Sequence, residues 1–362
     1  MKICFISGCI ARAGGTERVG SIIANALCDL KYDIYVLSFW NQGNPHYYLN
    51  PNIHVHYLLN PRQEGKLYRT YVYPILKLHY FLQNNMIDIV IDIDTELAIY
   101  TAYAVQFTKC KWISWEHFNY WTMLKLKEKK RFRAKKLIKK YADGLIVLTE
   151  EDRLKHIKQY NLPEDFVTTI YNPCPSNVKF KYSYDTHTFL SVGRLASQKG
   201  YDLLLDAWRI VEKTVPDWKL VIVGKGELEK ELLKKKELLQ LKNIEFVGHT
   251  NHIEEYYSVA SCYILSSRYE GFPMVILEAQ SYGLPTISFD CKTGPKDLIN
   301  GTNGILVENG NIEKLAKAMI LFTKDKLKAI NMSEEAMKSV QRFDLPIIIG
   351  CWEKVLNKIY KK

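Results

Sequence analysis

The chain has 362 residues, of which 47% are hydrophobic and 25% charged, and this composition is typical of a globular protein with two domains. It contains no run of eighteen apolar residues and its first apolar stretch is too short for a signal peptide, so we expect neither a membrane-spanning helix nor a leader. Eight cysteines lie scattered without a Cys-x-x-Cys pair, which argues against a zinc site and favours reduced thiols in a cytoplasmic protein.

The first half alternates apolar runs typical of buried strands with segments of helical periodicity. KICFISG predicts a first strand, and VGSIIANALCDL predicts the helix after it. YDIYVLSFW, NIHVHYLL, DIVIDID and KWISWEHF predict further strands. GLIVLTEEDRLKHI predicts a strand that passes into a helix with Thr149 as its N-cap.

Prolines and polar residues interrupt this pattern over 172–185, where we place a linker. Strands and helices then alternate again through HTFLSVGR, WKLVIVGKG, NIEFVGHT, CYILSSR and TISFD, and the chain ends in a helix over 345–362. Such alternation predicts an α/β protein with two doubly wound parallel sheets, whose ligands bind at the carboxyl ends of the strands. We expect one domain over 1–175, completed by 345–362, and a second over 176–344.

Loops at predicted strand ends carry the candidate binding residues. After the first strand, Gly14 and Gly15 precede a helix, where small residues allow an anion to approach, although a plain turn explains them equally well. The loop in SVGRLASQKGYDLL places Arg194 and Lys199 five residues apart, which suits a diphosphate better than two unrelated surface charges. The Gly-x-Gly of VIVGKGELEKELL lacks the rest of a dinucleotide fingerprint, and we interpret it as a turn.

The stretch SSRYEGFPMVILEAQSYGLP contains two glutamates, Glu270 and Glu278. Pro273 is suited to the first position of a helix that Gly283 ends, which gives an anion-binding N-terminus at 271–273. Residues eight apart in a helix are separated by about 12 Å of rise. The paired carboxylates of glycosidases lie only about 5–9.5 Å apart, so we expect these two to contact different parts of one elongated ligand.

Residues 123–143 hold ten Lys/Arg against Glu128 and Asp143, and this window supplies +8 of the chain's net +11. A solvated helix face, an anionic membrane surface and nucleic acid are the three interpretations. Apolar residues alternate with the cations, which favours a membrane. The candidate membrane-binding residues are Lys125, Lys129, Lys130, Arg131, Arg133, Lys136 and Lys140.

Together, GGTER, GRLASQKG, VGKGELEKEL, FVGHT and EGFPMVILEAQSYGLP resemble the retaining glycosyltransferases of family 4, over nearly the whole chain. The resemblance implies the GT-B fold, two Rossmann-like domains that face a central cleft. It also implies a terminal helix, containing Trp352, that returns to the first domain. The first domain would bind the acceptor and the second the nucleotide-sugar.

The resemblance further implies the roles of the site residues. Arg194 and Lys199 would bind the donor diphosphate, Glu270 the sugar hydroxyls and Glu278 the ribose, while His117 would lie near the sugar. The catalytic set is therefore His117, Glu270, Arg194 and Lys199. The other donor-binding residues would be Gly14, Gly15, Val247, Gly248, Gly271, Phe272, Pro273, Met274, Val275 and Ile276.

The expected reaction is transfer of a hexose or N-acetylhexosamine from a UDP-sugar to a glycan or polyprenyl diphosphate-linked acceptor, with retention, in bacterial capsule, lipopolysaccharide or lipid-linked glycan synthesis. Fixed cations stabilise the leaving diphosphate, so we expect no cofactor, no metal and no Asp-x-Asp metal motif. The enzyme would be cytoplasmic and peripheral on the inner face of the membrane. The alternatives are a UDP-sugar epimerase of the same fold and a basic nucleic-acid-binding protein, for which we find no base-reading motif.

Overall fold

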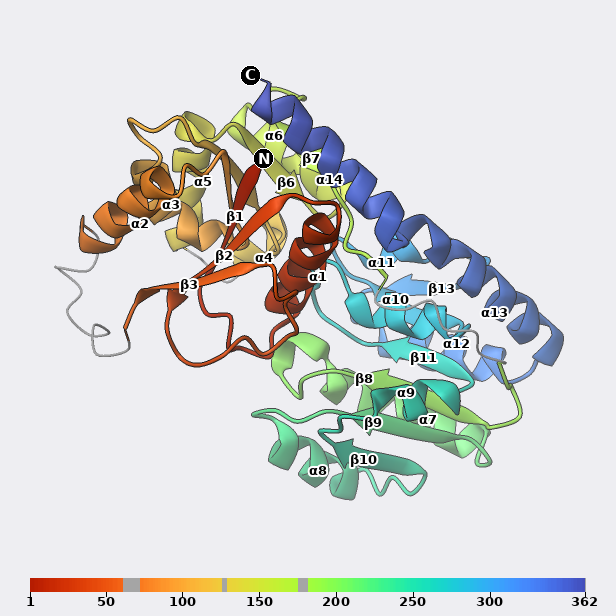
Figure 1. The fold of residues 1–362 in the computed structure, drawn as a ribbon. Coiled ribbons are helices and arrows are strands. Elements are labelled where there is room, and N and C mark those ends of the chain that lie inside the picture. Colours follow the sequence, from red (N-terminus) through yellow and green to blue (C-terminus); the bar gives the residue numbers. More distant parts are fainter. Residues whose placement is uncertain (61–71, 126–128, 175–181, 362) are drawn as a thin grey trace. The chain divides into compact units, whose positions relative to one another are not determined.

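The computed structural model describes residues 1–60, 72–125, 129–174 and 182–361. These divide into two compact units, Met1–Pro173 with Leu345–Lys362 and Cys174–Asp344 (Figure 1). Half of the linker expected over 172–185, residues 175–181, lies outside the described residues. The roles assigned to the two domains, acceptor binding and donor binding, stay predictions.

The first unit is built on a parallel sheet that has seven strands within the described residues, in the order β3-β2-β1-β4-β5-β6-β7. The strands are β1 (Lys2–Ser7), β2 (Asp33–Trp40), β3 (His54–Leu59), β4 (Ile89–Asp92), β5 (Lys111–Trp115), β6 (Gly144–Val147) and β7 (Val167–Thr169). The side chains of β1, β2, β4 and β6 are almost continuously buried, as expected for strands covered on both faces, whereas β3, at the edge of the sheet, is partly exposed.

Helices cover both faces of this sheet. They are α1 (Gly15–Asp29), α2 (Val72–Asn84), α3 (Ala98–Ala104), α4 (Tyr120–Lys125), α5 (Lys129–Tyr141), α6 (Glu150–Tyr160) and α14 (Leu345–Tyr360). Helices α2, α3 and α5 pack side by side on one face, and α1 packs against α14 on the other (Figure 1). Thr149 caps α6 by accepting a hydrogen bond from the Asp152 amide, which confirms that prediction.

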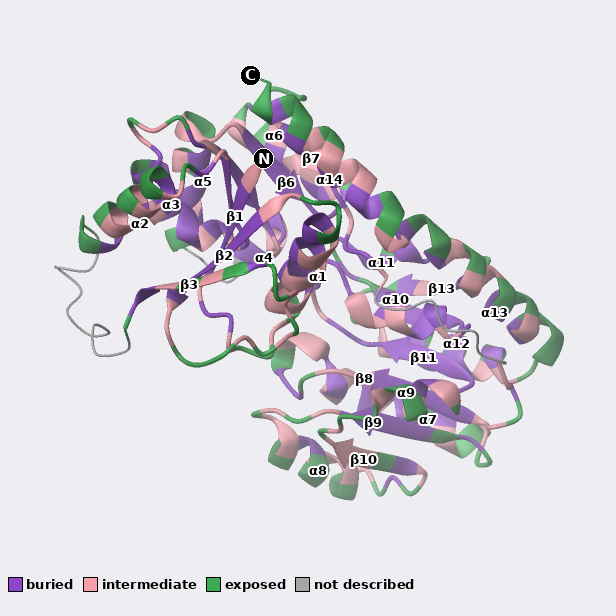
Figure 2. Cartoon of the chain, in the orientation of Figure 1, coloured by how far each residue is buried: buried purple, intermediate pink, exposed green. Residues whose placement is uncertain are grey.

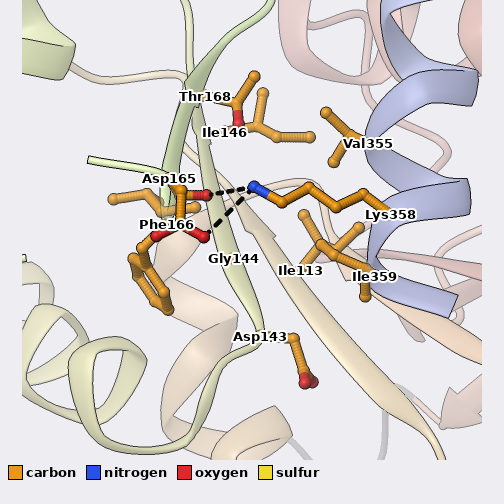
Figure 3. A pocket seen from close by; sticks show the side chains of 11 residues that line it. Ile113, Asp143, Gly144, Ile146, Asp165, Phe166, Thr168, Val355, Lys358 and Ile359 are labelled. Carbon is orange, nitrogen blue, oxygen red and sulfur yellow. Dashed lines mark hydrogen bonds and ion pairs between the residues drawn. The ribbon is translucent and has the colours of Figure 1, made fainter. Parts of the chain in front are cut away.

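Helix α14 is the terminal helix expected to return to the first domain, and it does so. The Trp352 ring is fully buried in edge contact with Trp115 and Phe5, at centroid distances of 4.7 and 6.3 Å. Near its end, α14 lies over a small pocket between β5, β6 and β7, where Lys358 Nζ donates a hydrogen bond of 3.1 Å to the Asp165 carbonyl (Figure 3). A Cβ on Gly144 would approach Ile359 to 3.1 Å, so this pocket is a packing seam.

The second unit is built on a parallel sheet in the order β10-β9-β8-β11-β12-β13, again counting described residues. Its strands are β8 (Thr188–Val192), β9 (Lys219–Val223), β10 (Ile244–Gly248), β11 (Cys262–Leu265), β12 (Thr286–Asp290) and β13 (Gly304–Glu308). Its helices are α7 (Tyr201–Thr214), α8 (Glu229–Leu238), α9 (Ile253–Ser258), α10 (Met274–Ser281), α11 (Pro295–Leu298), α12 (Ile312–Phe322) and α13 (Lys326–Val340). A core rich in aromatic residues, centred on Trp208, Phe189 and Phe289, holds the layers together.

Both sheets confirm the predicted doubly wound α/β architecture. In each unit the chain adds strands on one side of the first strand and then crosses to the other side, between β1 and β4 and between β8 and β11. Loops at such a crossing point diverge and leave room for a ligand at the carboxyl ends of the strands. A ligand of either sheet is therefore expected at these two places.

Candidate functional site

In the second unit, the crossing point brings together the two most informative loops of the sequence. Arg194 and Lys199 follow β8, and Glu270 follows β11, its neighbour in the sheet. Lys199 Nζ lies 2.7 Å from Glu270 Oε1, and both side chains are largely buried. Ser267 Oγ donates to the same oxygen at 2.6 Å. An ammonium and a carboxylate are thus held in place at the carboxyl edge of the sheet.

Arg194 differs from Lys199 in its surroundings. The residue is exposed, and its guanidinium makes no hydrogen bond or ion pair with another residue in the described part of the chain. A guanidinium at this position, beside a fixed ammonium, is able to bind an anion with two parallel hydrogen bonds. The structure therefore places both predicted cations on one loop and fixes only Lys199.

Contacts that the sequence analysis missed join these two loops. Arg268 donates from Nη1 to the Ser197 carbonyl at 2.9 Å and binds both oxygens of Asp202, at 2.7 and 2.5 Å. Its amide also donates to the Gln198 carbonyl at 2.8 Å. Gly200 has φ +64°, and a Cβ there would collide with the Ser266 carbonyl. The arginine directly before Tyr-Glu-Gly was the available signal, because an arginine fork suits carbonyl and carboxylate oxygens.

A second missed contact comes from the loop after β12. Thr293 is fully buried and donates to the Glu270 carbonyl at 2.8 Å. Its φ of +62° is rare for a β-branched residue, and such strain is retained where surrounding structure enforces it. A Cβ on the next residue, Gly294, would collide with the Pro273 ring. The sequence signal was a Lys-Thr-Gly-Pro loop at a strand end.

Helix α10 begins one residue later than predicted. Pro273 is the N-cap and Met274 is the first helical residue, because Pro273 has ψ +91°, outside the helical range. The Ile276 amide donates to the Pro273 carbonyl at 2.9 Å, so this amide is engaged within the protein, and the role of Ile276 in donor binding stays a prediction. Met274 and Val275 remain partly exposed at this helix end, where amides lack intrahelical partners. Gly271 precedes it, and the Phe272 side chain is buried against Phe343.

Glu278 lies in the second turn of α10 and has a different partner from Glu270. Its Oε2 accepts a hydrogen bond of 2.9 Å from Tyr257 Oη. Gly283 ends the helix with φ +72° as predicted. The two carboxylates thus have separate partners within the protein, and their contacts to a ligand stay predictions.

Val247 and Gly248 end β10, two strands away from β8. The Gly248 carbonyl accepts a hydrogen bond of 2.8 Å from Gly224, in the loop after β9. A Cβ on Gly224 or on Gly226 would collide with the backbone of Gly193 or Leu195. The Gly-x-Gly sequence therefore lets two strand-end loops pack together, and its interpretation as a turn agrees with this geometry.

In the first unit, Gly14 and Gly15 lie at the crossing point, between β1 and α1. Gly14 is the N-cap of α1, and a Cβ there would collide with the Glu17 carboxylate. A Cβ on Gly15 would meet no described atom within 4 Å. Space around Gly15 is therefore open in the first unit, and the roles of Gly14 and Gly15 in donor binding stay predictions.

His117 follows β5, at the same edge of the first sheet. Its ring lies 4.5 Å from the Trp115 ring, and its Nε2 is buried without a hydrogen-bond partner among the described residues. Burial lowers the pKa of His117 to about 4, against the attraction of Asp94 and Glu116. The imidazole is therefore neutral at pH 7 and offers a hydrogen bond rather than a charge.

The residue before it, Glu116, was missed by the sequence analysis and is the centre of a buried ionic cluster. Lys135 Nζ contacts its Oε2, Arg131 Nη1 lies 3.2 Å from its Oε1, and Thr95 donates to it at 2.8 Å. Arg131 also pairs with Asp94 at 2.8 Å. Burial raises the pKa of Glu116, but the two cations outweigh it and lower the pKa to about 2.

This cluster corrects the list of membrane-binding residues. Arg131 was expected to contact lipid, yet it is 3% exposed and points into the unit because its guanidinium pairs with carboxylates there. The side chain of Lys125 lies outside the described residues, as do residues 126–128. The exposed members of the list are Lys129, Lys130, Arg133, Lys136 and Lys140.

An Asp-x-Asp sequence does occur, Asp92-Ile93-Asp94, against the expectation that there is none. Asp92 is fully buried at the end of β4, and burial raises the pKa of its carboxyl to about 8. Asp94 instead pairs with Arg131. Among the described residues, no group of three His, Cys, Asp or Glu side chains is placed to hold a metal ion.

Comparison with known proteins identifies the family. Residues 13–177 match the model of Glycosyltransferase Family 4, and residues 177–339 match that of Glycosyl transferases group 1. An uncharacterized glycosyltransferase of Haemophilus influenzae is 32% identical over 98% of this chain and 99% of its own length. The chain belongs to this glycosyltransferase family.

Solved structures show the same fold. The lipopolysaccharide outer core galactosyltransferase WaaB matches with a TM-score of 0.78 at 23% identity, over 99% of both chains. Anabaena Alr3699/HepE, solved in complex with UDP and glucose, matches with a TM-score of 0.80 at 20% identity, over 99% of both chains. The predicted GT-B fold, with two Rossmann-like domains, is confirmed, and the enzyme is a transferase. No helix among the described residues is long and apolar enough to span a membrane.

Proposed function

We propose that this glycosyltransferase moves a hexose or N-acetylhexosamine from a UDP-sugar to a glycan or lipid-linked acceptor in the synthesis of a bacterial surface polysaccharide, with retention and without a metal. The observation that carries the proposal is the junction of two loops at the crossing point of the second sheet, where Lys199 pairs with Glu270. The names of the neighbours support the donor and pathway: one was solved with UDP and glucose, and another is a lipopolysaccharide galactosyltransferase.

The proposed chemistry follows from charge. When the sugar–phosphate bond breaks, negative charge develops on the departing diphosphate. Arg194, Lys199 and the amides at the start of α10 stabilise that charge, because they are positioned before the reaction and need little reorganisation. The phosphate oxygen then accepts the proton of the acceptor hydroxyl on the same face of the sugar, which gives retention.

Glu270 is proposed to orient the donor sugar and not to attack it. Its Oε1 already accepts hydrogen bonds from Lys199 and Ser267, which reduce its nucleophilicity. Glu278 would bind the ribose from α10, alongside Tyr257. His117, neutral at pH 7, would donate or accept a hydrogen bond at a sugar hydroxyl. We place the enzyme on the inner face of the cytoplasmic membrane, where lipid-linked acceptors are found.

The test is a panel of UDP-sugars, measured for hydrolysis and for transfer to a lipid-linked acceptor. We expect Arg194→Ala and Lys199→Ala each to lower kcat/KM by about 100- to 1000-fold, since each removes a stabilising donor. Circular dichroism should show an unchanged fold, and Lys230→Ala, an exposed lysine on α8, is the matched control.

Three outcomes would contradict the proposal. Full activity in either loop variant would remove the diphosphate assignment. Conversion of a UDP-sugar to its epimer without any acceptor would favour the epimerase. Inversion of the anomeric configuration in the product, read by NMR, would exclude retention.

A further inference from the structure

The outer face of α2 is apolar, which is unusual for a helix on the surface of a globular unit. From its start to Tyr80, the exposed residues are Val72, Tyr73, Leu76 and Tyr80, with exposed fractions between 45% and 64%. Pro74, Leu78 and Leu82 face the core. A surface helix normally shows charged residues on this side, and contiguous exposed apolar side chains mark an interaction surface.

The outer face of α5 is the opposite in character. Each of its exposed residues is a lysine or an arginine, and the buried side contains Ala134, Ile138 and the two cations of the Glu116 cluster. The exposed cations are Lys129, Lys130, Arg133, Lys136, Lys139 and Lys140. None of these faces a carboxylate in an ion pair among the described residues.

Helix α3 joins the two faces into one layer. His79 on α2 contacts the Ala104 carbonyl at the end of α3 at 2.8 Å, and Tyr103 on α3 lies 6.4 Å from the Tyr141 ring on α5. Lys140 lies over that ring at 4.8 Å. Exposed residues lie along α2 and α5, whereas α3 is mostly buried and exposes Tyr103 (Figure 2). Phe107, just after α3, is 98% exposed with φ +62°, a strained and fully hydrated aromatic residue.

The direction of the helices relates this layer to the candidate site. Helix α2 leads into β4 and α5 leads into β6, so both run toward the amino ends of the strands. Their first residues therefore lie at the carboxyl edge of the sheet, the edge where Gly15 and His117 are found. Val72, Leu76 and Arg133 are thus on the side of the first unit that a ligand of this unit would approach.

We propose that α2 and α5 form a two-part docking surface for an anionic lipid bilayer. The aliphatic and aromatic side chains of α2 enter the headgroup region, while the cations of α5 contact lipid phosphates. This proposal rests on the membrane location proposed above and names the surface that contacts the lipid. It does not depend on which sugar is transferred. A second copy fits poorly, because a two-fold contact through this face would bring two rows of cations together.

The test is flotation of the full chain with vesicles of phosphatidylcholine alone and of phosphatidylcholine mixed with phosphatidylglycerol. We expect binding to the mixed vesicles. Arg133→Gln with Lys136→Gln should weaken it on the order of 25-fold, about fivefold per cation. Leu76→Ser with Tyr80→Ser should weaken it about tenfold and abolish the binding that remains in high salt. In Leu76→Trp, brominated lipid should quench fluorescence beyond the quenching seen in the wild type.

Matched controls come from α8 in the second unit, where Lys230, Lys234 and Leu238 are exposed. Lys230→Gln with Lys234→Gln, and Leu238→Ser, should bind as the wild type does. UDP affinity, measured by calorimetry, should be unchanged in every variant. A wild type that floats without binding UDP would contradict the proposed UDP-sugar donor and support this inference. A wild type that binds UDP without floating would contradict this inference and support the proposed donor.

Three results would overturn the inference. The first is absence of binding to the mixed vesicles. The second is binding that Leu76→Ser with Tyr80→Ser leaves unchanged, since α2 would then take no part. The third is a dimer in sedimentation analysis that the same variant converts to monomer, which would assign the apolar face to a second copy of the chain.

Discussion

Arg268 connects the two loops on which the candidate donor site depends. It binds Asp202 with both nitrogens and the carbonyl of Ser197, and so fixes the loop of Lys199 against the loop of Glu270. Burial raises the pKa of Asp202, but hydrogen bonds and charge from Arg268 lower it below its usual range. The geometry of the site therefore depends on residues such as Arg268, which join the loops, as well as on the residues that would contact a ligand.

We expect Arg268→Ala to raise the KM for the donor about tenfold, with a smaller effect on kcat, because the two loops lose their shared clamp. Arg268→Lys should not restore it, since an ammonium cannot bind two carboxylate oxygens side by side. Asp202→Ala should have the same effect, and the double variant should be no worse than either. Additive losses in this cycle would show that the two residues act separately.

Asp92 gives a prediction of pH dependence. Its pKa is raised to about 8 in the folded unit, whereas an exposed aspartate has a pKa of about 3.9. The folded state therefore binds more protons between these values, and its stability falls as the pH rises from about 4 to about 8. In Asp92→Asn this contribution to the slope should disappear. Urea unfolding at a series of pH values measures it, and an unchanged slope would contradict the prediction.

At the scale of secondary-structure elements, the Glu116 cluster ties α5 to the loop that carries His117. The helix presents two cations inward and six outward, and the inward pair needs the carboxylate of Glu116. The basic run is thus both a buried ionic anchor and an exposed cationic face. The loop after β5 acquires its position from a helix later in the chain.

Glu116→Gln should lower the free energy of unfolding by about 3–5 kcal/mol, because it leaves Lys135 and Arg131 buried without their shared counter-charge. Glu96→Gln is the control: Glu96 is a more exposed partner of Arg131 and should cost less than about 1 kcal/mol. Because the pKa of Glu116 is lowered to about 2, its contribution is present above about pH 4 and is lost as the pH falls toward 2. Equal effects of the two substitutions in urea unfolding would contradict this.

At the scale of the whole molecule, the chain forms two units of separate cores, and the last helix belongs to the first. Trp352 joins the last helix to the first unit, since its buried ring contacts Phe5 on β1 and Trp115 on β5.

Trp352→Ala should destabilise the first unit by about 3–5 kcal/mol, as a large cavity replaces the ring. Hydrogen exchange should become faster in β1 and β5, while the amides of β8 and β11 keep their protection. Ile347→Ala, at an exposed position of the same helix, should change stability by less than about 0.5 kcal/mol. Faster exchange throughout both units would show that α14 stabilises the second unit as well.

Patterns in the sequence predicted the two parallel sheets, the strand-end loops of Arg194, Lys199 and Glu270, and the helix that contains Glu278, while the return of the terminal helix was implied by the family resemblance. Hydrophobic periodicity and strand-end glycines depend on residues close together in the sequence, so they can be recognised without the structure. Which cations of 123–143 are exposed depends on tertiary contacts, because Arg131 and Lys135 pair with Glu116 and Asp94 on other elements. It likewise decided that Arg268 and Thr293 brace the site and that α2 has an apolar outer face, since these depend on neighbours distant in sequence.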